Sequence, residues 1–206
     1  MIKNFVLDMG NVLILFKPTL FIERLQLSAE DSALLEQVIF KSPIWLEMDQ
    51  GLLNEAEACE FYQSQLPERL HEAMRKLVME WDQSLVEIEG MVELVAELKS
   101  KGYGIYLLSN ASQRQHEYWS RVSASQYFDG TLISADVKMM KPNYDIYDCL
   151  FDTFNLNPEE CFFIDDSKPN IMAAEEMGMK GYCFDNDVES LRETILQLVS
   201  EYEEAK

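Results

Sequence analysis

Short apolar runs alternate with amphipathic segments through most of this chain, and this alternation limits the folds that it can adopt. The runs cover residues 4–7, 103–108, 130–134, 161–164 and 181–184. After the second run, apolar residues recur every three or four positions in the stretches 113–122, 144–154, 171–177 and 188–204, and the stretch 91–100 before it shows the same spacing. Strands that alternate with helices form a parallel sheet covered on both faces. The pattern therefore predicts an α/β fold.

A long helical block interrupts the alternation after the first strand. Helical spacing of apolar residues continues through FIERLQL, SAEDSALLEQVIF, NEAEACEFYQSQL and PERLHEAMRKLVMEW. Ser28, Asn54 and Pro67 are residue types that favour the start of a helix. We therefore expect two parts: an α/β core made of residues 1–16 and 84–206, and an inserted α-helical domain made of residues 17–83.

The charge balance excludes two classes of partner. The 206 residues include 17 Lys and Arg against 37 Asp and Glu, a net charge of −20. Nucleic acids and anionic membranes attract basic surfaces, so we expect neither as a partner. No apolar run approaches the ~20 residues of a membrane span, and no targeting segment is visible. The four cysteines form no C-x-x-C pair, which favours reduced thiols and a cytoplasmic location.

Polar side chains follow four of the predicted strands. They are Asp8, the pair Ser109 and Asn110, Lys141, and the pair Asp165 and Asp166. The carboxyl ends of parallel strands meet at one edge of the sheet, where ligands bind. Three carboxylates in one place repel each other unless a cation lies between them, and Mg²⁺ prefers such oxygen ligands. A lysine and a hydroxyl suit phosphate. The set indicates phosphoryl transfer with a carboxylate nucleophile.

Four segments carry a resemblance to a known family. LDMGNVL, LLSNAS, KMMKPNYDIY and FIDDSKPNIMAAEEMGM resemble, in order, the four motifs of the haloacid dehalogenase (HAD) superfamily. The helical block stands where that superfamily inserts a small helical cap. The motifs and the segment WLEMDQGLLNEAE are most similar to the glucose-1-phosphate phosphatase-like branch, followed by the β-phosphoglucomutase-like branch. The resemblance implies a Rossmann-like core and an Mg²⁺-dependent phosphatase that acts on a small phosphorylated metabolite, a sugar phosphate.

The resemblance also implies a role for each motif residue. Asp8 matches the catalytic nucleophile that forms an aspartyl-phosphate, and Lys141 matches the catalytic lysine that holds the phosphate. Ser109 and Asn110 match substrate-binding positions in the phosphate loop. The metal ligands implied are Asp8, the backbone carbonyl of Gly10, Asp165 and Asp166.

One position departs from the superfamily pattern. The phosphatases carry a second Asp two residues after the nucleophile as general acid and base, and Gly10 occupies that place here. General acid–base catalysis is worth ~10²–10⁴-fold in rate. A mutase needs it in both directions, so Gly10 favours a phosphatase over a mutase. His116 and Arg114 follow the second motif and are candidates to replace the acid, although a helix there would turn them away.

Several alternatives stay open. The chain is also compatible with a non-catalytic or weakly active relative that lost its acid at Gly10, and with a β-phosphoglucomutase-like mutase. A dehalogenase also lacks the second Asp but has no use for the acidic pair at 165–166. Phosphonoacetaldehyde hydrolysis requires a cap lysine, for which Lys17 and Lys41 are available. A response-regulator receiver has these residue types in another order. The cap supplies specificity in the superfamily, so Trp45, Asp49 and Gln50 are candidates to face the substrate.

Overall fold

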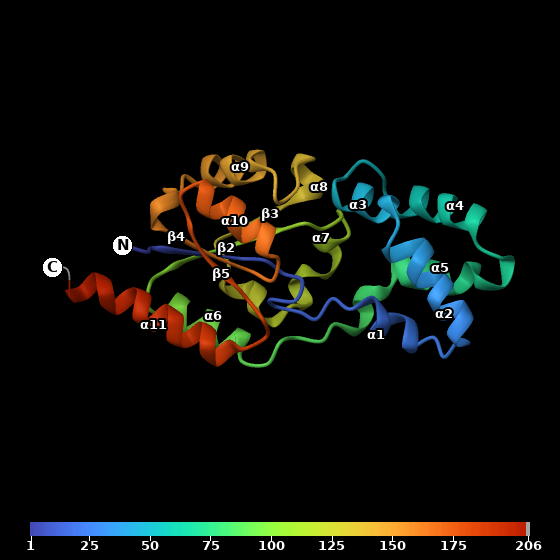
Figure 1. Cartoon of the computed structure of the whole chain (residues 1–206), viewed down its shortest axis with the longest axis horizontal. Helices are drawn as coiled ribbons and strands as arrows, with labels where there is room; N and C mark the ends of the chain where they lie inside the picture. Colours follow the sequence, from blue (N-terminus) through green and yellow to red (C-terminus); the bar gives the residue numbers. More distant parts are fainter. Residues whose placement is uncertain (205–206) are drawn as a thin grey trace.

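Five parallel strands form one sheet in the order β3-β2-β1-β4-β5 (Figure 1). In this computed structural model, which describes residues 1–204, the strands are β1 (Asn4–Leu7), β2 (Gly104–Ser109), β3 (Gly130–Ile133), β4 (Cys161–Asp165) and β5 (Lys180–Cys183). β1 is central: Leu7 pairs with Leu107 on one side and with Ile164 on the other. The predicted α/β fold with a Rossmann-like sheet is confirmed. Residues 205–206, which we assigned to the core, lie outside the described residues.

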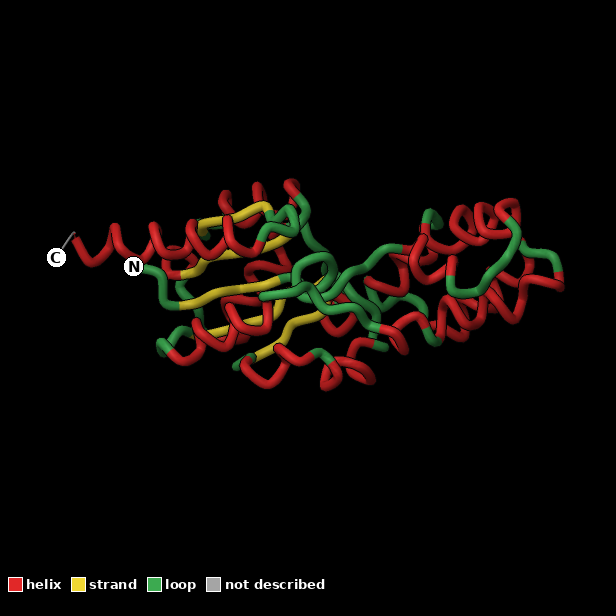
Figure 2. The backbone as a smooth tube through the Cα atoms, turned by 90° about the horizontal axis from the view of Figure 1, so that it is seen from below, coloured by secondary structure: helices red, strands yellow, loops and turns green. Residues whose placement is uncertain are grey.

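Helices cover both faces of the sheet (Figure 2). On one face, α6 (Met91–Ser100) and α11 (Val188–Glu204) pack against strand side chains that include Phe5. On the other face, α9 (Tyr144–Phe154) and α10 (Lys168–Glu176) pack around Val6 and Phe163. Successive strand residues point to opposite faces, so a strand covered on both faces is apolar at nearly every position. This explains why the strands appear in the sequence as continuous apolar runs.

The segment between β1 and α6 forms a helical block beyond the carboxyl ends of the strands (Figures 1 and 2). Its α-helices are α1 (Pro18–Glu23), α2 (Ala29–Leu35), α3 (Pro43–Asp49), α4 (Glu55–Gln65) and α5 (His71–Met79). A π-helical turn, η1 (Glu36–Phe40), and two 3₁₀ turns, η2 (Glu68–Leu70) and η3 (Trp81–Ser84), complete it. The block buries its own apolar cluster, which includes Leu35, Tyr62 and Met74. We call the block from α1 to η3 the cap, and the rest of the chain the core.

Two of the three expected helix starts are confirmed by side-chain capping. The Ser28 hydroxyl accepts the backbone N–H of Asp31 at 3.1 Å at the start of α2. At the start of α4, Asn54 Oδ1 accepts the N–H of Glu57 at 3.0 Å while Glu57 Oε2 accepts the N–H of Asn54 at 2.9 Å. Pro67 precedes the 3₁₀ turn η2 instead of an α-helix. Both caps satisfy N–H groups that the first helical turn leaves without a partner.

The helix expected over 113–122 is shorter than predicted. Only α7 (Gln115–Tyr118) is α-helical, and the 3₁₀ turns η4 (Trp119–Arg121) and η5 (Ser123–Tyr127) follow it. Tyr118 and Val122 are both buried in the cluster under the sheet, and Val122 is extended. Packing of both side chains overrides the local helical pattern. The remaining short elements are α8 (Ser134–Val137) and η6 (Pro158–Glu160). Among residues 1–204, no helix is both long enough and apolar enough to cross a membrane.

Candidate active site

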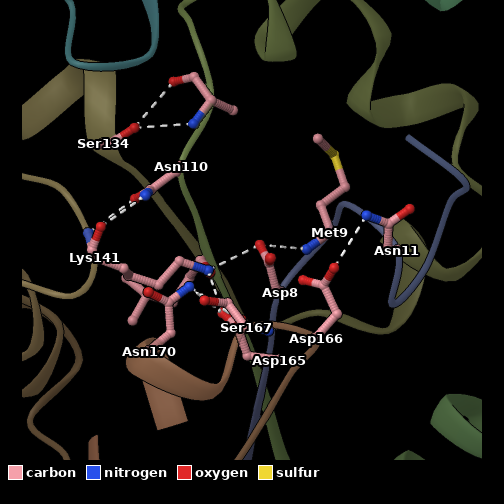
Figure 3. Close-up of polar contacts among 12 residues, drawn as sticks. Asp8, Met9, Asn11, Asn110, Ser134, Lys141, Asp165, Asp166, Ser167 and Asn170 are labelled. Atoms are coloured by element: carbon pink, nitrogen blue, oxygen red, sulfur yellow. Dashed lines mark hydrogen bonds and ion pairs between the residues drawn. The ribbon is translucent and has the colours of Figure 1, made fainter. Parts of the chain in front are cut away.

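The polar residues predicted at the strand ends gather at one edge of the sheet, and Figure 3 shows Asp8, Asn110, Lys141, Asp165 and Asp166 among them. Asp8 directly follows β1, Ser109 is the last residue of β2, and Asp165 is the last residue of β4. Lys141 lies in the loop between α8 and α9, and its side chain contacts Asp8 and Asp165. The parallel topology brings these side chains together because adjacent strands of the same direction end at the same edge.

The Lys141 ammonium stands at the centre of this group. Its Nζ lies 2.9 Å from Asp8 Oδ1 and 2.7 Å from Asp165 Oδ2, and it donates to the Leu108 carbonyl at 2.8 Å. These three contacts use all three N–H donors of a lysine. The side chain is 1% exposed, and a buried charge is tolerated only when it is paired and hydrogen-bonded. Lys141 is therefore held at one place beside Asp8.

Asp165 is the anchor of Lys141. Its carboxylate is fully buried. Besides the ammonium, it accepts the Asn170 side-chain amide at 3.0 and 3.1 Å and the backbone N–H of Ser167 at 2.8 Å. Both carboxylate oxygens thus have N–H partners from the protein. The position of Asp165 is fixed by α10 and by the turn that precedes it.

Burial and mutual repulsion set the protonation of the group. Burial raises the pKa of Asp8 to about 7; the charge of Lys141 opposes this rise and that of Asp165 adds to it. Burial lowers the pKa of Lys141, but the attraction of Asp8 and Asp165 outweighs burial and leaves this pKa raised. Burial also raises the pKa of Asp166. The lysine therefore keeps its charge, while burial of Asp8 and Asp166 favours the protonated forms of these two carboxyls.

Three carboxylates lie close enough to share a cation. Asp8, Asp165 and Asp166 each offer an oxygen, and these oxygens lie within 4.8 Å of one another. Asp166 is oriented by the Asn11 side-chain amide, which donates to its Oδ2 at 3.0 Å. Asn11 itself adopts a left-handed conformation, with φ of 54°, in the turn that follows Asp8. Gly10 lies in the same turn. This donor set is the oxygen-rich type that Mg²⁺ prefers.

Asn110 connects the loop after β2 to the loop that carries Lys141. Its side-chain Nδ2 donates to the Lys141 carbonyl at 2.9 Å, and its Oδ1 accepts the Lys141 N–H at 2.9 Å. Ser109 is 1% exposed and lines the cleft above Asp8. In the next position, the backbone N–H of Ala111 donates to the Ser134 hydroxyl at 2.9 Å. The loop after β2 is therefore fixed at two neighbouring points.

A cleft of about 310 Å³ separates the strand ends from the cap. The core side of the cleft is formed by Asp8, Met9, Gly10, Asn11, Phe16, Ser109, Asn110, Ala111, Ser112, Tyr118 and Asp166. The cap side is formed by Trp45, Leu46, Met48, Asp49, Glu55, Val78 and Trp81. This volume is at the small end of ligand pockets. Among the described residues that line the cleft there is no lysine, arginine or histidine.

Direct contacts dock the cap on the core beside this cleft. The Ser134 hydroxyl donates to the Asp49 carbonyl, and Gln50 Nε2 donates to the Lys138 carbonyl at 3.3 Å. The Ser112 hydroxyl donates to Glu55 Oε1 at 2.6 Å. Gly51 has φ of 70°, and a Cβ at this position would lie 2.3 Å from the Ala135 carbonyl oxygen. Only glycine therefore allows the cap backbone to approach the core this closely at position 51.

The structure separates the secondary candidates. Trp45 and Asp49 line the cleft, whereas Gln50 is absent from its described lining and contacts the core. His116 is exposed and pairs with Asp136, and Arg114 pairs with Asp82, so neither replaces the missing acid.

Sequence reasoning did not single out Phe16, Glu55, Trp81 or Tyr118, which also line the cleft. Helical periodicity marks such residues as inward-facing without distinguishing a cleft from a core.

Comparisons with known proteins agree with this architecture. Residues 47–183, about two thirds of the chain, match the haloacid dehalogenase-like hydrolase family. A HAD family enzyme of Bacteroides thetaiotaomicron, solved as a magnesium complex, is 26% identical, with a TM-score of 0.71 over 90% of this chain and 94% of that chain. A HAD-like hydrolase of Porphyromonas gingivalis has a TM-score of 0.73 at 24% identity over 97% of this chain and 98% of that chain, a likeness of fold.

Three characterised relatives carry phosphatase or hydrolase names. A sesquiterpene phosphatase of Aspergillus oryzae is 26% identical over 87% of this chain and 88% of its own length. Flavin mononucleotide hydrolase 1 of Arabidopsis thaliana is 29% identical over 69% of this chain. A phosphorylated carbohydrates phosphatase of Thermotoga maritima is 30% identical over 54% of it. The matches span 57% and 51% of the last two proteins. The chain belongs to the haloacid dehalogenase-like hydrolase family.

Proposed function

We propose that this hydrolase is an Mg²⁺-dependent phosphatase that cleaves a small phosphate ester, a sugar phosphate, through an aspartyl-phosphate on Asp8. The observation that carries the proposal is the placement of Lys141, whose ammonium contacts both Asp8 and Asp165 beneath the cleft. Asp166 lies beside them. Phosphoryl transfer to a carboxylate needs a nucleophile, a fixed positive charge and an acidic neighbour. Asp8, Lys141 and Asp166 supply these groups.

The residues present fit Mg²⁺. The ion would be held by Asp8, the Gly10 carbonyl and Asp166. The Asp8 carboxylate contacts Lys141 and the Met9 N–H through Oδ1. Its Oδ2 makes neither of these contacts and can bind the ion. Asp165 already accepts three N–H groups, so its part is to anchor Lys141 and to approach the ion through water. Bound Mg²⁺ would neutralise phosphate charge as a Lewis acid.

The chain's own residues divide the reaction between them. Asp8 attacks phosphorus, the bond to the leaving alcohol breaks, and water then hydrolyses the aspartyl-phosphate. Lys141 balances charge on the phosphate oxygens, and Ser109 and Asn110 hold the phosphate in the loop after β2. The proposed inserted domain of residues 17–83, with 1–16 and 84–206 as the core, agrees with the cap to within one residue at each end. The cap closes the cleft and excludes bulk water during the first step.

The cap side of the cleft favours a neutral leaving group rich in hydroxyls. Trp45 and Trp81 line the cleft with aromatic surface that suits apolar C–H groups, and the carboxyl groups of Asp49 and Glu55 can form hydrogen bonds with hydroxyls. Without a cation in the described lining, a second anionic group on the substrate would face only carboxylates. The relatives' names range from carbohydrates to a terpene and a flavin, so the preference for sugars rests on the cleft and on the motif resemblance.

A panel of phosphate esters tests the proposal. Phosphate release is measured from sugar 1-phosphates, sugar 6-phosphates, glycerol phosphate and p-nitrophenyl phosphate, with Mg²⁺ and with chelator. We expect release that requires both Mg²⁺ and Asp8, as judged by Asp8→Asn, with Asp148→Asn on the exposed face of α9 as the matched control.

Three outcomes count against the proposal. Isomerisation of a sugar phosphate without net phosphate release indicates a mutase. Mg²⁺ and phosphate binding without turnover indicates a non-catalytic relative. Release that persists in Asp8→Asn excludes the aspartyl-phosphate.

A further inference from the structure

Gly10 leaves the proposed reaction without a proton carrier on the core side of the cleft. Apart from Asp8 and Asp166, which have other roles, the protonatable side chains in the described lining are Asp49, Glu55 and Tyr118. Burial raises the pKa of Tyr118 well above its usual value, which makes its phenol a poor proton donor near neutral pH. The two cap carboxyls remain.

The two cap carboxyls differ in what surrounds them. Glu55 accepts the Ser112 hydroxyl at 2.6 Å and is held toward that loop. Asp49 interacts with the Ser112 backbone N–H and with the Trp45 side chain. Burial, with the charges of Glu55 and Asp8 as further causes, raises the pKa of Asp49 well above its usual value, although the two hydrogen bonds oppose this. Asp49 thus lines the same cleft as Asp8, in surroundings that favour the protonated form of its carboxyl.

The backbone around Asp49 is fixed to the core. Its carbonyl accepts the Ser134 hydroxyl, and the same hydroxyl contacts Ala111 in the loop after β2. Gly51, two residues later, lies directly against Ala135. A proton donor must be positioned within hydrogen-bond reach of the leaving oxygen. These contacts place the end of α3 over the strand ends whenever the cap is docked.

We propose that Asp49, supplied by the cap, is the general acid and base of this hydrolase and takes the place of the missing Asp at position 10. The inference rests on the proposed phosphatase function and adds to it the group that moves the proton. Because the donor resides on the cap, the acid is in place only when the cap is docked on the core.

The proton balance closes over two steps. In the first, Asp8 forms a bond to phosphorus, the bond from phosphorus to the leaving oxygen breaks, and the Asp49 carboxylic acid gives its proton to that oxygen. In the second, water attacks the phosphorus of the aspartyl-phosphate, the bond from phosphorus to the Asp8 oxygen breaks, and the Asp49 carboxylate takes the proton from that water. Phosphate departs, Asp8 is a carboxylate again and Asp49 is protonated again.

Leaving-group dependence tests the role of Asp49. The variant Asp49→Asn keeps the shape of the side chain and an oxygen that accepts the same hydrogen bonds, but it carries no acidic proton. Two esters are compared: p-nitrophenyl phosphate, whose leaving group needs no proton, and the alkyl phosphate that the wild type cleaves fastest. We expect kcat/KM for the alkyl ester to fall by ~10²-fold or more and kcat/KM for p-nitrophenyl phosphate to stay near the wild-type value.

The second step gives an independent readout. With p-nitrophenyl phosphate, Asp49→Asn retains the first step but has no base for the water. We expect kcat to fall and a burst of p-nitrophenolate, stoichiometric with the enzyme, to precede the steady state.

Restoring an acid at position 10 should rescue the variant. A Cβ added to Gly10 meets only the Phe16 Cβ within 4 Å, at an ordinary 3.6 Å, so an Asp side chain can start from this position. We expect the double variant Gly10→Asp, Asp49→Asn to recover most of the lost kcat/KM for the alkyl ester. Glu47→Gln removes another carboxylate from α3, outside the described lining of the cleft, and serves as the matched control.

The outcomes separate this inference from the proposed function. Equal loss on both esters, or no loss on either, overturns the role of Asp49. If Glu55→Gln, and not Asp49→Asn, lowers kcat/KM for the alkyl ester alone, the proton donor is Glu55. This result also overturns the role of Asp49. A wild type that releases no phosphate from any ester refutes the proposed function, and the inference fails with it.

Discussion

The core places charged side chains at the strand ends, in and beneath the cleft, whereas the cap lines the cleft with apolar, aromatic and acidic side chains carried by short helices. On the core side, Lys141 and Asp165 are almost fully buried and have protein partners for their polar atoms. On the cap side, Trp45 is half-buried and Leu46 is exposed. The difference indicates that the core holds the phosphate and metal chemistry common to the family, while the cap determines what is attached to the phosphate and how its departure is assisted.

The largest effect is expected from removing the fixed cation on the core side. In Lys141→Met, two neighbouring carboxylates lose their common partner, and breaking a buried ion pair costs about 3–5 kcal/mol. The free energy of unfolding, measured with urea in the presence of chelator, should fall by this amount. Phosphate release should fall by about 10²–10³-fold, as on removal of a group that stabilises the transition state.

Two comparisons make this prediction specific. Lys101→Met, at an exposed lysine near the opposite edge of the sheet, should leave both quantities near wild type. Mg²⁺ should restore part of the stability of Lys141→Met, because it supplies positive charge to the same carboxylates. An unchanged free energy of unfolding in Lys141→Met would mean that the ion pairs of Lys141 do not stabilise the fold.

The next largest effect is expected in metal affinity. Asn11 orients Asp166, and groups that orient metal ligands are worth about 10–100-fold in affinity. Asn11→Gly removes the amide while tolerating the positive φ, and Mg²⁺ affinity measured by calorimetry should fall by that factor. Asn186→Gly, at an exposed Asn with φ of 73°, controls for the backbone. Wild-type affinity in Asn11→Gly would remove Asn11 and Asp166 from the metal site.

A smaller effect, confined to ester recognition, is expected on the cap side. Trp45 lines the cleft and packs against Phe40 with ring centroids 4.7 Å apart. Trp45→Leu should raise KM for the best sugar phosphate about three- to tenfold, equivalent to the ~0.5–1.5 kcal/mol of an aromatic contact. Inhibition by inorganic phosphate should not change, because phosphate meets only the core side. If Trp45→Leu changed KM for the sugar phosphate and the inhibition constant of inorganic phosphate by the same factor, the cap side would not recognise the sugar separately from the phosphate.

The smallest effect is expected from a change inside the cap that leaves the cleft untouched. Ser28 caps α2 away from the cleft, and loss of such a cap costs about 1 kcal/mol. Ser28→Ala should lower the free energy of unfolding by that amount and leave kcat/KM unchanged. A loss of activity in Ser28→Ala without a loss of stability would mean that the start of α2 affects the geometry of the cleft.

The sequence predicts the core side of the site better than the cap side for a physical reason. Asp8, Ser109 and Asp165 follow apolar runs, and parallel topology brings all strand ends to one edge. The contacts that fix them are harder to predict, because the bond from Asn170 to Asp165 depends on the angle at which α10 leaves the strand. Glu55 and Trp81 come from different elements, and only the packing of the cap brings them to the cleft.

Chemical trapping of the enzyme during turnover tests the central claim most directly. The wild type is mixed with Mg²⁺ and its fastest ester, quenched, reduced with borohydride and mapped by peptide mass spectrometry. Borohydride reduces an acyl phosphate to an alcohol, so the account predicts homoserine at position 8, formed only when the ester is present. With p-nitrophenyl phosphate as the ester, we expect homoserine to be more abundant in Asp49→Asn than in the wild type. Phosphate release with aspartate intact at position 8, or with the reduced residue at another position, would contradict the account.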